Sequence, residues 1–520
     1  MDMTKYLKYA PTLLIIAFLS GLSLIFRLAG LLHQYPFWVD EFSSANQAKL
    51  ILKDLSGSLS YFSSTIEQNN RLSHLFIAGS FNLFGTSVWS AKLPFALFGS
   101  FIPAMIYLLT LKLSNKATAF SAGVLAALSY FFITWSVQAR SYSLLQLLIL
   151  ANIYGYVKIT NTSKLKKRYL ILFLITLLLG ISTHFFFYLL ILSLAVHYAL
   201  YNYSKIRLII SGKSFLLWMF GIAAVVYNLQ LLKAIKDTYG SGDIFSNNIW
   251  YYHSFLWREY GLISFLGIVG LVHLFIKNRR ITLIFLIYSS IHLIFITILW
   301  HPYSTRYLLP LFPLLFIGVA NSIYILARSL SNRFAAVLTI FLVTSIIVNG
   351  DKFVLKPKTY YSVNHDFREI AVIDYDNVYN LIKSKGQLEK NQTAVIDTWH
   401  DRIYWYLGSD FPHSYIFRWA QESGLINGLT KTTEFKTNFK GEKYIPDVKN
   451  LLYVADLRDL KLAMKKYPRG FIFIDDASLP KDVIDYAESN FKKELYLDHY
   501  PLDDNPYSIW PATLYSWGIK

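Results

Sequence analysis

Apolar runs long enough to span a bilayer recur through the first 350 residues of this 520-residue chain. A transmembrane helix needs roughly 17–25 mostly apolar residues. About eleven such runs are present, near 10–32, 90–111, 118–136, 141–157, 169–184, 186–203, 214–232, 260–276, 281–299, 307–327 and 334–350. The charged fraction is only 16%, and the mean hydropathy is +0.37. The pattern predicts a polytopic α-helical membrane protein and excludes a disordered chain.

Lysine and arginine in the short loops predict the orientation. With the N-terminus in the cytoplasm, seventeen basic residues fall on the cytoplasmic side, in the loops at 5–8, 112–116, 158–168, 205–213, 277–280 and 328–333. Only Asp2 opposes them. The loop 33–89 and the tail 351–520 then face outward from an inner (plasma) membrane. The first run is expected to stay as an anchor rather than to be cleaved as a signal peptide.

One segment of the loop 33–89, residues 72–84, is apolar but short for a span. Counting 72–84 as a span would place the basic loop at 164–168 outside, against the orientation rule. We therefore expect 72–84 to form an interfacial helix on the outer surface, and 42–54 to form a second one.

The tail after residue 350 alternates short β-rich runs with helical patterns. The expected strands are 393–399, 413–419, 450–457, 470–476 and 494–500, with helices at 458–467 and 479–489. This rhythm predicts an extracytoplasmic α/β domain with a partly parallel sheet. Pro511 predicts that the last apolar run is an edge strand or two short pieces. The chain is thus expected to have two domains, 1–350 and 351–520.

Charge and motifs exclude several functions. The net charge of +18 arises in residues 1–350, which hold 27 basic and 8 acidic residues, against 23 and 24 in the tail. An excess of basic residues that is confined to the loops between membrane spans does not indicate a nucleic-acid-binding face. The absence of cysteine excludes thiol catalysis, and no Walker or GxGxxG motif indicates nucleotide use.

An acidic pair, Asp40-Glu41, follows the first span in FWVDEFSS. A partly desolvated carboxylate near the membrane boundary can act as a general base or bind a cation. The alternative is that Asp40 caps the helix that follows. The pairing and the position favour a catalytic role.

Two arginines, Arg140 and Arg306, are expected at outer ends of spans. A single such arginine is usually a snorkelling anchor. Two on the same face as Asp40 indicate a phosphate clamp, because guanidinium groups bind phosphate bidentately. Tyr142 and Tyr307 follow them and can add hydrogen bonds or stacking.

Four histidines are expected on this outer face: His74, His184, His253 and His301. They are candidates for binding substrate or a divalent metal, although their spacing matches no standard metal motif and the metal stays unknown. The alternative is that they fill the interface. In the tail, Asp475-Asp476 is expected to cap a helix rather than to bind metal.

The order of these motifs resembles the GT-C class of polyprenyl-phosphate-sugar-dependent glycosyltransferases, over residues 10–350. The motifs are the acidic pair, KLPFALFGSFIPAMIYLL, QARSYSLL, STHFFF, RYLLPLFP and an outer α/β domain. The nearest look-alikes are relatives of protein O-mannosyltransferases and lipid A aminoarabinose transferases. NNRLSHL replaces the His-Pro-Pro-Leu-like stretch common in the family, and the WWDYG-type motif of oligosaccharyltransferases is absent.

The resemblance implies transfer of a hexose or pentose from a polyprenyl phosphate to an extracytoplasmic acceptor, which is a lipid-linked glycan, an LPS-type glycan or a protein. It implies that Asp40 is the base, with Glu41 as its acidic neighbour, and that Arg140 and Arg306 hold the carrier phosphate. His184 matches a histidine often found at that span end. One base without a covalent intermediate predicts inversion, by analogy with inverting glycosidases.

Two other functions stay open at this point. A lipid-linked sugar transporter or flippase would place ionisable groups and helix breaks at mid-membrane. Pro310 and Pro313 fit that alternative, whereas the clustering of ionisable groups at the outer ends favours the enzyme. The third function is a non-catalytic scaffold, in which Asp40 and both arginines would tolerate alanine.

Overall fold

The computed structural model describes residues 10–32, 37, 39–54, 70–160, 166–209, 245–300, 303–350, 352–353, 375–385, 392–408, 414–417, 436–437, 440–445, 451–475, 480–497 and 512–519. The chain divides into two compact units. The first comprises Met1–Gln34, Ala48–Leu231 and Asp243–Tyr360, and the second comprises Tyr35–Gln47, Leu232–Gly242 and Tyr361–Lys520.

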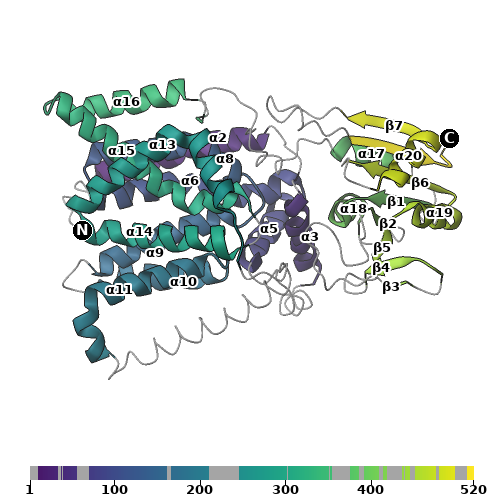
Figure 1. Ribbon diagram of the computed structural model, residues 1–520, viewed down its shortest axis with the longest axis horizontal. Helices are drawn as coiled ribbons and strands as arrows, with labels where there is room; N and C mark the ends of the chain where they lie inside the picture. The colour runs from purple at the N-terminus through teal and green to yellow at the C-terminus, as the bar shows by residue number, and fades with distance from the viewer. Residues whose placement is uncertain are drawn as a thin grey trace. The chain divides into compact units, whose positions relative to one another are not determined.

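The described secondary structure of the first unit is helical apart from one isolated β-bridge (Figure 1). Its helices are α2 (Ala10–Leu32), α5 (Arg71–Phe84), α6 (Val88–Leu113), α7 (Lys116–Leu128), α8 (Tyr130–Ser136), α9 (Tyr142–Thr160), α10 (Lys167–Ile181), α11 (Phe187–Ile209), α13 (Ile249–Lys277), α14 (Arg279–Ile294), α15 (Phe312–Leu330) and α16 (Ala335–Asn349). A π-helical turn, η2 (Phe295–Leu299), extends α14, and a 3₁₀ helix, η3 (Thr305–Leu311), precedes α15. These helices lie at the expected spans, except that 118–136 is divided into two helices and 214–232 lies outside the described residues.

Six of the described helical segments are long and apolar enough to cross a membrane. They are Ala10–Ala29, Val88–Leu113, Tyr142–Thr160, Ile249–Lys277, Arg279–Leu299 and Thr305–Leu330. Large apolar side chains on their outer faces stay exposed, for example Ile276 and Leu330. Apolar side chains cover the lipid-facing surface of a membrane protein. The chain is thus a polytopic helical membrane protein, as expected, and its total number of spans stays a prediction.

Small residues allow α13 and α15 to pack backbone against backbone. A Cβ atom added at Gly270 would lie 1.8 Å from the carbonyl oxygen of Gly318. Close approach at small residues is the usual way in which membrane helices gain packing contacts. Glycine at these two positions therefore fixes how α13 and α15 meet.

The third expected span, 118–136, is two helices rather than one. Ser129 has an extended backbone between α7 and α8 and pairs with Phe353 as an isolated β-bridge. Tyr130 N–H donates to the carbonyl oxygen of Lys352 at 3.1 Å. A chain segment that is remote in sequence thus takes the hydrogen bonds that a continuous helix would have used.

The second unit contains an eight-stranded sheet with the order β3-β4-β5-β2-β1-β6-β8-β7. Its strands are β1 (Thr393–Asp397), β2 (Ser414–Phe417), β3 (Lys436–Thr437), β4 (Lys443–Ile445), β5 (Leu451–Val454), β6 (Arg469–Ile474), β7 (Lys492–Leu497) and β8 (Ala512–Trp517). The neighbours β5-β2-β1-β6 are parallel, whereas the outer pairs are antiparallel. The helices are α17 (Tyr375–Lys385), α18 (His400–Leu407), α19 (Leu457–Lys466) and α20 (Lys481–Asn490). This confirms the expected α/β region with a partly parallel sheet.

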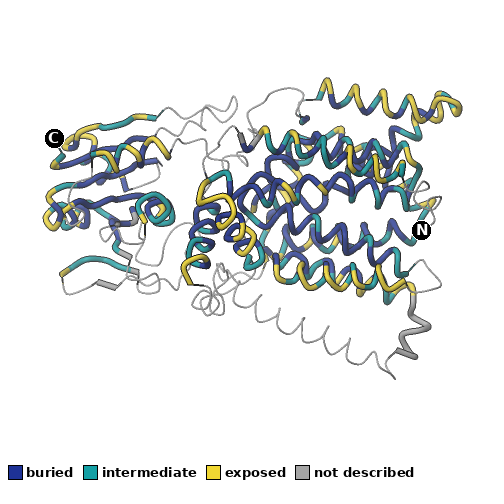
Figure 2. Tube along the Cα trace, turned by 180° about the vertical axis from the view of Figure 1, so that it is seen from behind, coloured by how far each residue is buried: buried dark blue, intermediate teal, exposed yellow. Residues whose placement is uncertain are grey.

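The expectation that Pro511 would make the last run an edge strand is wrong, because β8 lies between β6 and β7. The alternative of two short pieces stays a prediction, since the run up to Pro511 lies outside the described residues. β8 begins at Ala512, after the proline, and pairs with both β6 and β7. All six of its residues are buried, whereas β7 at the edge is largely open, as Figure 2 shows.

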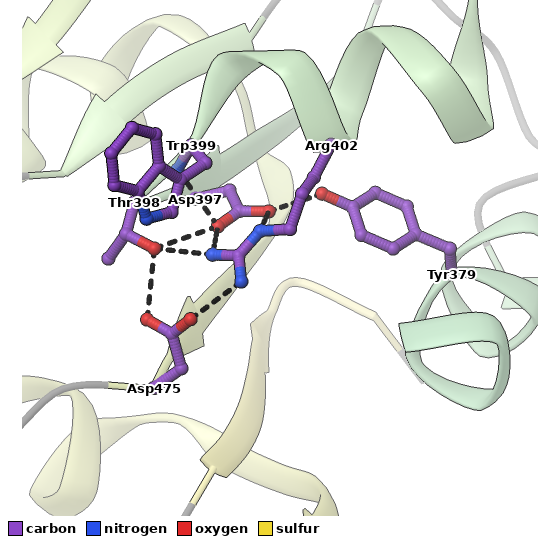
Figure 3. A network of polar contacts seen from close by, with 6 residues as sticks. All are labelled: Tyr379, Asp397, Thr398, Trp399, Arg402 and Asp475. Atoms are coloured by element: carbon purple, nitrogen blue, oxygen red, sulfur yellow. Dashed lines mark hydrogen bonds and ion pairs between the residues drawn. The ribbon is translucent and has the colours of Figure 1, made fainter. Parts of the chain in front are cut away.

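A buried polar network lies where the order of the parallel strands reverses, between β1 and β6 (Figure 3). Arg402 of α18 pairs with Asp397 at the end of β1 and, at 2.6 Å, with Asp475 directly after β6. Thr398 donates to Asp475 at 2.9 Å, and Tyr379 donates to Asp397. Asp475 is therefore an ion-pair partner, and its expected role as a helix cap is wrong. Asp476 lies outside the described residues.

Candidate functional site

The first unit brings both predicted arginines to one cluster of aromatic side chains. Arg140 lies in the turn between α8 and α9, and Arg306 lies in η3. The guanidinium carbon of Arg306 is 5.6 Å from the ring centroid of Tyr142 and 5.4 Å from that of Tyr307. Both arginines are half-buried. An aromatic face stabilises a guanidinium, and guanidinium N–H groups are donors that can bind an anion.

Buried polar side chains hold η3 in place. Gln146 of α9 donates to the carbonyl oxygen of Leu309 at 2.7 Å. His292 of α14 lies 2.7 Å from the carbonyl oxygen of Tyr307 through Nε2. Two neighbouring helices thus fix the short helix that carries Arg306. Sequence reasoning missed His292, although a histidine inside an apolar run was the available signal.

His184 lies beside the arginines, in the loop between α10 and α11. Its ring centroid is 5.6 Å from that of Tyr142. The N–H of Phe186 donates to His184 Nδ1 at 3.2 Å. Burial, followed by the positive charges of Arg140 and Arg306, lowers the pKa of His184 to about 3. A neutral ring with Nδ1 as acceptor carries its proton on Nε2, which is then a donor without a net charge.

The start of α5 belongs to the same cluster. Ser141, next to Arg140, donates to the side-chain oxygen of Asn70 at 2.8 Å. His74 of α5 is buried, and burial with the charge of Arg140 lowers its pKa to about 3. The stretch NNRLSHL, which departs from the family pattern, therefore reaches the arginine cluster through Asn70 and His74.

The other candidate histidines do not join this cluster in the described structure. His253 is exposed on α13, and His301 lies outside the described residues. Within the described part of the chain, no three His, Asp or Glu side chains are placed to hold a metal ion. The described histidines therefore do not support the divalent-metal site considered from the sequence.

The acidic pair lies on α3 (Val39–Lys53). Asp40 is the second residue of this helix and is partly exposed, whereas Glu41 is buried. A carboxylate in the first turn is favoured by the helix dipole. Asp40 and Glu41 group with the second unit, and Arg140 and Arg306 with the first. The joining of the acidic pair and the arginines in one site therefore stays a prediction.

Comparisons with known proteins identify the fold. A family model described as dolichyl-phosphate-mannose-protein mannosyltransferase matches residues 72–229. No curated protein matches the chain significantly.

Several solved structures match nearly the whole chain. ArnT from Cupriavidus metallidurans matches with TM-scores of 0.55 in the apo state and 0.53 bound to undecaprenyl phosphate, each at 10% identity and covering 98% of both chains. The archaeal oligosaccharyltransferase AglB from Archaeoglobus fulgidus, in complex with an inhibitory peptide and a dolichol-phosphate, matches with a TM-score of 0.54 at 12% identity. That match covers 96% of this chain and 74% of AglB. These matches confirm the GT-C fold that the sequence motifs indicated.

Proposed function

We propose that this GT-C-fold membrane protein is a glycosyltransferase that moves one sugar from a polyprenyl phosphate to an acceptor outside the cytoplasm. The observation that carries the proposal is the convergence of Arg140 and Arg306 on His184, whose ring lies beside Tyr142. Two half-buried cations at one aromatic cluster suit the phosphate of a lipid carrier. The solved relatives carry undecaprenyl phosphate in one case and dolichol-phosphate in another.

In the proposed reaction Asp40 accepts the proton of an acceptor hydroxyl as that oxygen attacks the anomeric carbon. The bond between this carbon and the phosphate oxygen breaks, and the electron pair leaves with the polyprenyl phosphate. Arg140 and Arg306 stabilise the charge that develops on the phosphate. Attack opposite the leaving group, without a covalent intermediate, inverts the anomeric centre.

Neutral His184 has a defined part in this scheme. Its Nε2–H donates a hydrogen bond to a phosphate or sugar oxygen, because Nδ1 already accepts from Phe186. A neutral donor adds no positive charge to a cluster that already holds two arginines. His184 therefore helps to orient the sugar donor and does not strengthen the binding of the anionic product, polyprenyl phosphate.

The membrane topology follows from the charge pattern. We assign the N-terminus to the cytoplasm and residues 351–520 to the outer side of an inner (plasma) membrane, since the basic loops alternate accordingly. The hydroxyl-bearing acceptor is then a glycan or a protein of the cell envelope. The sugar is a hexose or a pentose.

A transporter or flippase is less well supported. The matching structures are a GT-C transferase and an oligosaccharyltransferase, and the matching family model is a mannosyltransferase. Pro310 lies in the short helix η3 and Pro313 in the first turn of α15, where proline is tolerated, so neither interrupts α15. The helix breaks expected of a transporter are therefore not found at these prolines.

The test is a donor assay with purified full-length protein in detergent. A panel of polyprenyl-phosphate sugars is supplied with an extract of cell-envelope acceptors, and free polyprenyl phosphate is followed by mass spectrometry. We expect release from one donor by the wild type and its loss in Asp40→Asn. Release that persists in Asp40→Asn would refute Asp40 as the base, and no release from any donor would refute the transferase.

A further inference from the structure

Residues 39–47 of helix α3 belong to the second unit and present two different faces there. Residues four positions apart share a helix face, so Phe42 lies with Asn46, and Asp40 lies with Ser44. Ser44 Oγ donates to the carbonyl oxygen of Asp40 at 3.4 Å. At 100° per residue, the direction of Phe42 is roughly 200° from that of Asp40. The Phe42 face and the Asp40 face therefore point in nearly opposite directions.

The Phe42 face packs against two helices of the C-terminal region. The Phe42 ring centroid is 5.8 Å from that of Tyr375 in α17 and 5.9 Å from that of Tyr406 in α18. Asn46 Nδ2 donates to the carbonyl oxygen of Asp401 at 2.8 Å. Phe42 is fully buried, and Asn46 is 3% exposed. A ring cluster and a hydrogen bond thus hold this face in one register.

The buried network at the sheet supports the contact from behind. The Arg402 guanidinium carbon lies 4.6 Å from the Tyr375 ring centroid. The same guanidinium is held by Asp397 and Asp475 at the ends of two parallel strands (Figure 3). Tyr375 therefore lies between Arg402 and Phe42. The sheet is thus connected to α3 through the side chains of Arg402, Tyr375 and Phe42.

We propose that the C-terminal domain positions Asp40 for catalysis by holding the opposite face of α3 through Phe42 and Asn46. This inference rests on the proposed function, in which Asp40 is the base. A general base acts only within hydrogen-bond reach of the hydroxyl, and small displacements of a catalytic group are costly. Phe42 and Asn46 are positioning residues, because they act through the helix that carries Asp40.

The test compares Phe42→Ala and Asn46→Ala with wild type in full-length enzyme, using the donor that it turns over. We expect kcat to fall about 10–100-fold and the KM for the donor to change less than about twofold, because the geometry of the base is disturbed and not donor binding. Phe42→Leu, which keeps much of the apolar contact, should restore most of kcat. Asn46→Ala removes one hydrogen bond and keeps the ring packing, so it serves if Phe42→Ala fails to fold.

A matched control removes a ring from the same domain at another place. Phe491 packs against Trp517, with ring centroids 5.3 Å apart. We expect Phe491→Ala to lower the melting temperature and leave kcat unchanged below it. An equal loss of kcat in Phe491→Ala and Phe42→Ala would overturn the inference, because domain stability would then explain both.

A double-mutant cycle with Asp40→Glu separates positioning from a general effect. If Phe42 acts through residue 40, Phe42→Ala should cost less kcat in the Asp40→Glu background than in wild type. Strict additivity would refute the positioning role. If kcat is unchanged in both Phe42→Ala and Asn46→Ala while Asp40→Asn is inactive, the positioning role is refuted and the proposed function stands. If Asp40→Asn is active, the role of Asp40 as the base is itself refuted.

Discussion

The Arg306 guanidinium carbon lies 5.6 Å from the ring centroid of Tyr142, which joins the start of η3 to the start of α9. Lysine keeps the charge but loses both the stacking and the bidentate fork. We expect Arg306→Ala to lower kcat/KM by about 10²–10³-fold, as for loss of one transition-state donor. Arg306→Lys should recover only part of this loss, as measured by release of polyprenyl phosphate.

The matched control for Arg306 is Arg333, an exposed arginine near the start of α16. Arg333→Lys should leave kcat/KM unchanged. Full activity in Arg306→Lys would show that a point charge is sufficient, and would contradict bidentate binding of the phosphate.

Acid should destabilise the protein through its buried histidines. The pKa of His184 falls from an ordinary value of 6.5 to about 3 in the folded state, through burial and the charges of Arg140 and Arg306. Between these values the unfolded chain binds a proton that the folded chain does not, so stability falls as the pH falls below 6.5. Between neutral pH and pH 5, the titration of His184 lowers the free energy of unfolding by roughly 2 kcal/mol.

His184→Gln removes that proton-linked loss. We expect its melting temperature in detergent to fall less between pH 7.5 and pH 5 than that of the wild type. His253→Gln, at an exposed histidine, should behave as the wild type does. An equal fall in both variants would show that His184 is not held neutral by the fold.

Close packing of α13 on α15 gives a prediction about folding. A Cβ at Gly270 would meet the carbonyl of Gly318 at 1.8 Å, whereas a Cβ at Gly261 in the same helix would meet nothing within 4 Å. Gly270→Ala should therefore lower the melting temperature, and Gly261→Ala should leave it equal or raise it, since alanine favours a helix. A neutral Gly270→Ala would mean that the two helices do not meet at this point.

The positions of helices and strands were predictable where they depend only on the local pattern of apolar residues. Span positions follow from apolar runs, and the strands of the tail follow from β-rich runs between helices. Prediction from the sequence failed where a distant segment decides the outcome. Ser129 ends α7 because residues 352–353 supply hydrogen bonds there. Asp475 was expected to cap a helix because it follows a strand and precedes a helix. Its ion-pair partner, Arg402, is 73 residues away, and the sequence does not indicate this pairing.

The candidate site was predictable to a similar extent. Arg140 and Arg306 were predicted because two arginines at outer ends of spans are expected on the same face as Asp40. That both arginines lie near His184 depends on tertiary packing, through contacts such as Gln146 with the backbone of Leu309. Asn70 carried no chemical signal, since a lone asparagine is common in loops. Its contact with Ser141 arises only when α5 and the turn before α9 come together.

The network around Arg402 should be needed for the stability of the C-terminal domain. Arg402→Met would leave Asp397 and Asp475 buried without their cation, which costs about 3–5 kcal/mol when one partner of a buried pair is removed. The combined variant Arg402→Met/Asp397→Asn/Asp475→Asn removes the stranded charges and should regain much of that loss. Lys466→Met, which breaks a more exposed pair with Glu442 at 2.6 Å, should cost about 0–1 kcal/mol.

Hydrogen exchange of the amides of β1 and β6 in the full-length protein measures each effect, because these strands pair directly beside the network. Unchanged protection in Arg402→Met would contradict a stabilising role, and the sheet would then have to be held by the apolar contacts of Ile396 and Ile472.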